Sequence, residues 1–155
     1  MNKEIQSIIR NFQDINSGEP WYGRSVFTLL DEVDTAKAGK KPTEAAHSVT
    51  ELLHHMLIWA EFTLKRIQGN KEDMDSFEKL DWRQIDPAIH TWERGLAEFK
   101  TIHDKIIQLL KEKDDEFLKE KVDYRDYDFR YLLNGLIQHN IYHAGQITYI
   151  NKYLN

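Results

Sequence analysis

The long stretches without glycine or proline constrain this chain most strongly. Only seven glycines and three prolines occur among its 155 residues, and several long segments lack both. In those segments apolar residues recur every three or four positions, which is the spacing of one face of an α-helix rather than of a strand. The sequence therefore predicts an all-α protein. The predicted helices span Asn2–Ile15, Ser25–Ala38, Ser48–Gln68, Asp86–Leu110 and Phe129–Tyr153.

Local signals indicate where some of these helices begin and end. Ser48 followed by Glu51 is the capping-box pattern of a helix start, and Gly69 is a helix stop signal. The pair Asp86-Pro87 is typical of a helix that carries proline at its first position. Three long helices and a broken first helix predict a four-helix bundle with long connections. We expect residues 1–155 to form this bundle as a single domain.

The composition excludes several classes of protein. The formal net charge is −5, and no dense run of lysine and arginine occurs, so a nucleic-acid groove is not expected. Cysteine is absent, which excludes disulfides and thiolate ligands. The chain has neither a signal-peptide-like start nor a run of about 20 apolar residues that could cross a bilayer. We therefore expect a soluble, cytoplasmic protein.

His139 and His143 carry the strongest chemical signal in the sequence. They lie four residues apart on the apolar stripe of the final predicted helix, so both imidazoles should project from one face toward the bundle interior. Buried imidazoles need partners. One interpretation is that neighbouring groups hydrogen-bond them, and the other is that they share a metal ion.

His55 is the candidate third ligand. It shares a helix face with Leu52 and Trp59, so we expect it to point toward the bundle axis. Three inward histidines from two helices suit Zn, Ni, Fe or Mn, with a position open for water or substrate. Its neighbour His54 points about 100° away, and we expect it to support the site or to lie at the surface. The other histidines are expected to be structural: His47, His90 and His103, the last two on the third long helix.

Two other kinds of metal site do not fit the sequence, and two polar residues near the histidines could assist them. A zincin needs a glutamate between the paired histidines, and residues 140–142 supply none. A di-iron bundle needs two Glu-x-x-His pairs and two further carboxylates on its helices. One of the two pairs in this sequence precedes its helix, and the final helix supplies histidine instead of glutamate. Glu51 is one turn before His55 and could orient it, but a capping role is favoured. Gln146 follows His143 by three and could reach the open side of a metal or bond elsewhere.

At these residues the chain resembles the DinB-like (DinB/YfiT) superfamily of small helical bundles. The matching segments are Trp21–Gly23, His47–His55 followed by Trp59, and His139–Ile147. The resemblance extends over about residues 2–153. It implies a DinB/YfiT-like four-helix bundle, a divalent metal held by His55, His139 and His143, and a homodimer. The resemblance assigns the first ligand to His55 and not to the adjacent His54, and the structure tests this assignment.

The resemblance also suggests a reaction class. Some relatives are thiol-dependent transferases or isomerases, so the first hypothesis is a metal-dependent enzyme that transfers a small-molecule thiol to an electrophile, with hydrolysis as the second reaction class. A second hypothesis is a metal-binding or stress-response protein without turnover. A third is a purely structural dimer whose inward histidines bond carboxylates.

Overall fold

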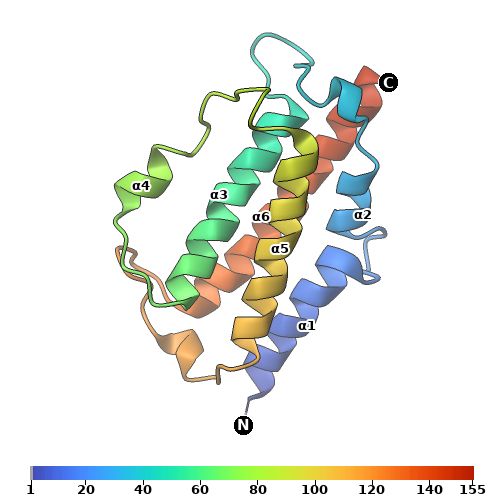
Figure 1. The fold of residues 1–155 in the computed structure, drawn as a ribbon. Coiled ribbons are helices and arrows are strands. Elements are labelled where there is room, and N and C mark those ends of the chain that lie inside the picture. The colour runs from blue at the N-terminus through green and yellow to red at the C-terminus, as the bar shows by residue number, and fades with distance from the viewer. Residues whose placement is uncertain (1) are drawn as a thin grey trace.

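The third predicted helix lies at the centre of the fold. In the computed structural model, which describes residues 2–155, this helix is α3 (Val49–Ile67), and it packs against α5 (Trp92–Leu110) and α6 (Phe129–Leu154) (Figure 1). Most of its side chains are buried, because apolar residues cover more than half of its circumference. The predicted ends of the first and final helices are correct to within two residues.

The remaining side of the bundle is formed by a broken helix. Its two parts, α1 (Lys3–Ser17) and α2 (Val26–Asp31), contact each other and both contact α6. Figure 1 shows them following one another along the same side of the bundle. The fold is therefore the predicted all-α four-helix bundle with a broken first helix. Its fully buried side chains come from all four sides and include Phe12, Leu30, Phe62, Phe99 and Leu133.

The helix predicted over Ser25–Ala38 is wrong in its second half. The α-helix ends at Asp31, and a separate 3₁₀ turn, η1 (Thr35–Lys37), follows. The carboxylate of Asp34 accepts a hydrogen bond from the backbone N–H of Ala36 at 3.1 Å. This local cap starts a new turn, since aspartate side chains compete with the helical backbone for such donors.

The predicted start of the third long helix at Asp86-Pro87 is also wrong. Residues 86–90 form a turn in which the backbone N–H of His90 donates to the carbonyl of Asp86 at 2.7 Å. The helix α5 begins at Trp92, where the Thr91 hydroxyl accepts from the backbone N–H of Arg94. His90 consequently precedes the helix instead of lying on it. The proline that was read as a first helical residue belongs to the turn.

Both predicted end signals of α3 are confirmed. Ser48 and Glu51 form the complete capping box. At the other end, Gly69 has a φ of +77°, and the two backbone hydrogen bonds of a Schellman motif close the helix, Gly69 N–H to Arg66 and Asn70 N–H to Lys65, both at 3.0 Å. The start and end of α3 fix where its side chains point.

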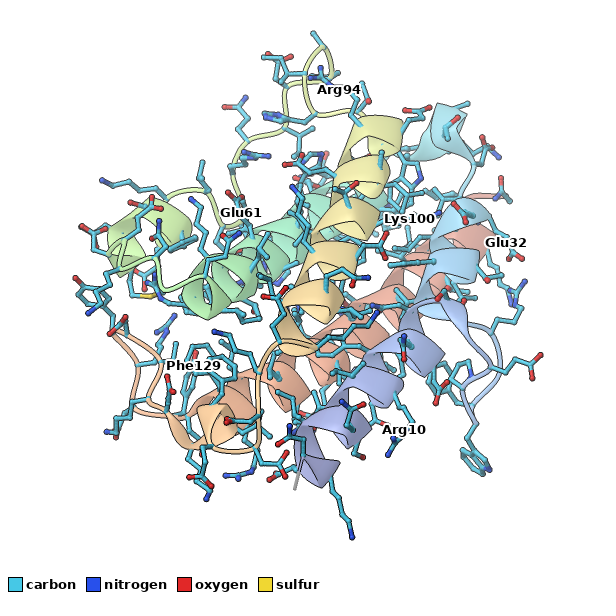
Figure 2. All side chains as sticks on the ribbon, turned by 60° about the horizontal axis from the view of Figure 1, so that its bottom comes forward. Arg10, Glu32, Glu61, Arg94, Lys100 and Phe129 are labelled. Atoms are coloured by element: carbon cyan, nitrogen blue, oxygen red, sulfur yellow. The ribbon has the colours of Figure 1, made fainter. Side chains whose placement is uncertain are left out.

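Two connections flank these helices. The first contains the short helix α4 (Met74–Glu78), and the second contains the 3₁₀ turn η2 (Phe117–Lys119), whose Phe117 and Leu118 are buried. Figure 2 shows the charged side chains of Arg10, Arg94 and Lys100 on the outside of the bundle. Across residues 2–155, no helix combines the length and the apolar character that crossing a membrane requires.

Candidate metal centre

Three histidines from two helices converge between α3 and α6. His55 comes from the middle of α3, while His139 and His143 come from successive turns of α6. The Nε2 atoms of His55 and His139 lie 3.0 Å apart. One ring nitrogen from each of the three residues lies within 4.8 Å of the others. The structure thus brings together the three residues that the sequence singled out.

Hydrogen bonds on the outer ring nitrogens orient two of these imidazoles. Nδ1 of His55 contacts a carboxylate oxygen of Asp81, and Nδ1 of His143 lies 2.6 Å from the side-chain oxygen of Gln146. Both partners accept at these atoms, so each Nδ1 carries the proton and each Nε2 keeps a free lone pair. Fixing the tautomer in this way prepares an imidazole to bind a metal ion.

His139 is held differently. Its Nδ1 is buried and has no hydrogen-bond partner among the described residues. Burial, reinforced by His143 and His55 nearby, lowers the pKa of His139 to about 3. Burial also lowers the pKa of His143, against the opposing effect of its bond to Gln146. Both rings are therefore neutral at physiological pH, which is the form that ligates metals.

The donor set fits a divalent transition metal. With the His55 proton on Nδ1, two lone pairs would face each other across 3.0 Å unless a proton or a cation lay between them. Two imidazole nitrogens bound to one ion at about 2.0–2.1 Å, with right or tetrahedral angles between the bonds, are about 2.8–3.4 Å apart. The observed separation therefore agrees with two ligands of a single ion.

Two residues of the connection after α4 complete the surroundings of His55, and both were missed in the sequence. Asp81 supplies the orienting carboxylate. The indole of Trp82 stacks on the His55 ring, with 3.9 Å between ring centres and 12° between planes, and His47 stacks on Trp82 at 4.0 Å. Trp82 has a φ of +51°, a left-handed conformation that is unfavourable for an aromatic residue. The polar composition of this connection gave no signal of either contact.

His54 does not join the cluster. It is buried, so the expectation that it could be a surface residue is wrong. Its Nδ1 accepts a hydrogen bond from Arg83 at 3.1 Å. Burial and the Arg83 charge lower the pKa of His54 to about 4. His55 is consequently the member of the adjacent pair that faces His139 and His143.

The two helper residues have definite partners. The Glu51 carboxylate accepts from the Ser48 backbone N–H at 2.7 Å and pairs with Lys41 at 3.1 Å, so its capping role holds and the orienting role passes to Asp81. Gln146 bonds Nδ1 of His143 instead of the inner side of the cluster. The inner side of the cluster is therefore formed by the ring nitrogens of the three histidines.

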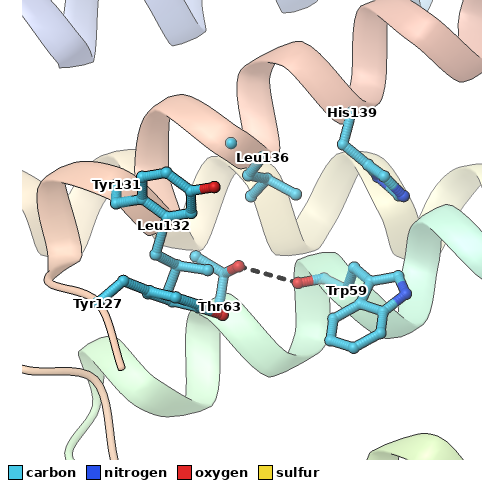
Figure 3. A pocket seen from close by; sticks show the side chains of 8 residues that line it. Trp59, Thr63, Tyr127, Tyr131, Leu132, Leu136 and His139 are labelled. Carbon is cyan, nitrogen blue, oxygen red and sulfur yellow. Dashed lines mark hydrogen bonds between the residues drawn. The ribbon is translucent and has the colours of Figure 1, made fainter. Parts of the chain in front are cut away.

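A pocket adjoins the histidine cluster along the same two helices. It has a volume of about 170 Å³ and includes His139 in its wall. Figure 3 shows Trp59 of α3 facing Leu136 and His139 of α6 across it. Trp59 lies one helical turn beyond His55, and Gly135, also in the wall, lies one turn before His139. The pocket and the cluster therefore occupy consecutive turns of α3 and α6.

Comparison with known proteins identifies a family that the chain matches. The family model of the DinB superfamily matches residues 23–147, a span that contains all three clustered histidines and the connection that carries Asp81. No curated protein and no solved structure gives a significant match to the chain.

Proposed function

Because the chain belongs to the DinB superfamily, we propose that it is a divalent-metal-dependent enzyme whose ion is held by His55, His139 and His143. The observation that carries this proposal is the 3.0 Å approach of Nε2 of His55 and Nε2 of His139, with His143 completing the group. The imidazole donors suit Zn, Ni, Fe or Mn. Such an ion acts as a Lewis acid that lowers the pKa of a bound thiol or water and so supplies a nucleophile near neutral pH.

The residues around the ligands have separable tasks. Asp81 accepts a hydrogen bond at Nδ1 of His55, and Gln146 does the same at Nδ1 of His143, so the neutral form of each ring presents its Nε2 lone pair. Trp82 covers one face of His55. Three protein ligands leave coordination positions for a small molecule, which is the arrangement of catalytic sites and not of closed structural ones.

Metal retention is the first test. Purified protein is loaded separately with Zn²⁺, Ni²⁺ and Mn²⁺, dialysed and analysed for metal content. We expect about one ion per chain, the stoichiometry of a single three-ligand site, and its loss in His139→Ala. The matched control is His54→Gln, an adjacent buried histidine outside the cluster, which should retain the ion. Circular dichroism verifies that both variants remain helical. Absence of a retained ion in the folded wild-type protein would overturn the proposal.

Thiol transfer is the proposed reaction, with hydrolysis second. The test is a screen of low-molecular-weight thiols with electrophilic acceptors, followed by a screen of ester and amide substrates. Turnover that requires the metal and is absent in His139→Ala supports the enzyme. An ion retained at full occupancy with no turnover in either screen supports the alternative, a metal-binding or stress-response protein without catalysis.

We further propose that the protein acts in the cytoplasm as a homodimer. Tyr142, Tyr149 and Tyr153 follow one another on α6 in steps of seven and four and are 64%, 75% and 66% exposed. Such a stripe of exposed aromatic side chains is typical of a protein interface. Analytical ultracentrifugation should give twice the chain mass for the wild-type protein and a monomer for Tyr149→Glu.

A further inference from the structure

The pocket beside His139 has room because a side chain is missing. Gly135 lies inside α6, where glycine is less favourable than alanine. A Cβ atom built on Gly135 would meet nothing within 4 Å, so neither a close helix contact nor an unusual φ requires glycine there. The absent side chain instead leaves open space in the wall of the pocket. This glycine weakens the helix and at the same time keeps the pocket open.

The walls of the pocket are aromatic and uncharged. Trp59 lies on one side, Tyr127 and Tyr131 lie at one end with 5.1 Å between ring centres, and no charged side chain lines the pocket. The Thr63 hydroxyl donates its proton to the carbonyl of Trp59 at 2.9 Å, so toward a ligand its oxygen can only accept a hydrogen bond. Burial raises the pKa of the Tyr127 hydroxyl, which keeps it neutral. A charged group would lose part of its hydration here without gaining an ionic partner among the residues that line the pocket.

A cation lies close to this wall. The Arg125 guanidinium is over the ring of Trp59, 5.8 Å from the ring centre, and it is not among the residues that line the pocket. The pocket volume, about 170 Å³, is close to that of an engineered apolar cavity of about 150 Å³ that binds benzene. The size and the flat aromatic walls therefore match a single aromatic ring.

We propose that this pocket binds the uncharged, single-ring aromatic part of the small molecule on which the histidine site acts. The inference rests on the proposed function for the role of His139, which belongs to both the pocket and the histidine cluster. A ring bound between Trp59 and Leu136 would place its substituent toward His139. The occupancy of the pocket itself is testable without metal.

The test uses two fluorinated probes with the same ring. Binding of neutral 4-fluorobenzyl alcohol and of anionic 4-fluorobenzoate to the metal-free full chain is measured by ¹⁹F NMR titration. We expect the alcohol to bind with a dissociation constant on the order of 1 mM, a reasonable value for so small a ligand. The benzoate should bind at least about tenfold more weakly, because its charge finds no partner.

Two matched variants locate the binding. Gly135→Leu fills the open space and should weaken binding of the alcohol at least about tenfold. Gly145→Leu is the control, because Gly145 also lies in α6 with nothing within 4 Å of an added Cβ, yet it lines a different pocket with Tyr22 and Tyr149. Circular dichroism and a cooperative thermal unfolding transition verify that both variants are folded. Equal binding in wild type and Gly135→Leu, no binding in wild type, or equal binding of the two probes overturns the proposal.

A paramagnetic ion then tests the placement beside the metal. In protein loaded with Co²⁺, the ¹⁹F relaxation of the bound alcohol should be faster than in protein loaded with Zn²⁺. If Co²⁺ is retained and the relaxation is unchanged, the pocket does not serve the metal site and the inference fails. If no Co²⁺ is retained, the proposed function fails, while binding of the aromatic ring is still decided by Gly135→Leu.

Discussion

At the residue scale, Asp81 orients the imidazole of His55, and we expect this contact to affect binding of the proposed metal ion. Its carboxylate accepts a hydrogen bond from Nδ1–H of His55, which directs the Nε2 lone pair toward the cluster. In Asp81→Ala we expect metal affinity to fall about 10- to 100-fold, since partners of ligating histidines contribute that much. Competition with a chromophoric chelator measures the change.

The control for Asp81 is Asp75→Ala. Asp75 lies on α4 in the same connection, is exposed, and is not part of the histidine cluster, so its loss should leave metal affinity unchanged. If both substitutions lowered metal affinity equally, Asp81 would act through its negative charge and not by orienting His55.

A second residue-scale prediction concerns the buried His103 in the core. Its Nδ1 donates to the Phe99 carbonyl at 2.9 Å, and its Nε2 accepts from Asn140 at 2.8 Å. Burial lowers the pKa of His103 to about 4, partly offset by the bond to Phe99. Between this value and the unfolded value near 6.5, only the unfolded chain binds the extra proton. Acid therefore lowers the free energy of unfolding, by about 1.4 kcal/mol per pH unit for this group.

Urea unfolding of the metal-free protein at several pH values between about 6.5 and 4.5 measures this slope. Folding also lowers the pKa values of His54, His139 and His143, which adds to the slope in this range, so the comparison needs a variant that removes the contribution of His103 alone. The double variant His103→Leu/Asn140→Leu removes both polar partners and leaves no unpaired amide. Its slope should be smaller than that of the wild type by about 1.4 kcal/mol per pH unit. Identical slopes would show that His103 does not titrate as described.

At the scale of the element, the capping box of α3 supports the helix that carries His55. The Ser48 hydroxyl accepts from the backbone N–H of Glu51 at 3.1 Å. Ser48→Ala should lower the free energy of unfolding by about 1 kcal/mol, measured by urea denaturation. The control is Asn2→Ala at the start of α1, because Asn2 makes no side-chain capping bond and its loss should cost much less. An equal loss in both variants would contradict the capping argument.

The sequence predicts well those features that depend on residues close to one another in the chain, such as helical spacing and helix caps. The convergence of His55, His139 and His143 follows from helical spacing, because each lies on an apolar face that must turn inward. The start of α5 was misplaced because Asp86-Pro87 suits both a helix start and the turn that the structure adopts. Only the cap at Thr91 distinguishes the two possible helix starts, and it competes with the proline signal four residues earlier.

The connection between α4 and α5 shows what local patterns do not contain. Asp81 and Trp82 reach His55 across 26 and 27 residues of chain, and the register of this contact depends on how the whole segment folds back over α3. No periodicity specifies such a contact. The positive φ of Trp82 is also unexpected for an aromatic residue. Its stacking between His47 and His55 supplies a tertiary reason that only the folded chain has.

At the scale of the whole molecule, a bound ion would link α3 to α6 and stabilise the bundle. An ion that binds only the folded chain adds about 2.7 kcal/mol at a free concentration of 100 times its dissociation constant. For a chain of this size, that corresponds to a rise in Tm of about 5–10 °C. Differential scanning calorimetry with and without Zn²⁺ measures it, and chelation should reverse it.

His139→Ala provides the control for this thermal shift. It should unfold at the same temperature with and without Zn²⁺, because the ion then has no complete site. A shift that persists in His139→Ala would assign the stabilising ion to another part of the molecule.

His139 follows His55 by 84 positions in the sequence, so the two helices that carry the histidines are synthesised at different times. When α3 leaves the ribosome, the helix that must supply the other two imidazoles has not been translated. If the proposed ion binds at these residues, it would therefore not guide the early stages of folding and would only stabilise a bundle that is nearly complete. Metal starvation in a growing cell should accordingly leave newly made chains folded but more easily degraded, instead of preventing them from folding.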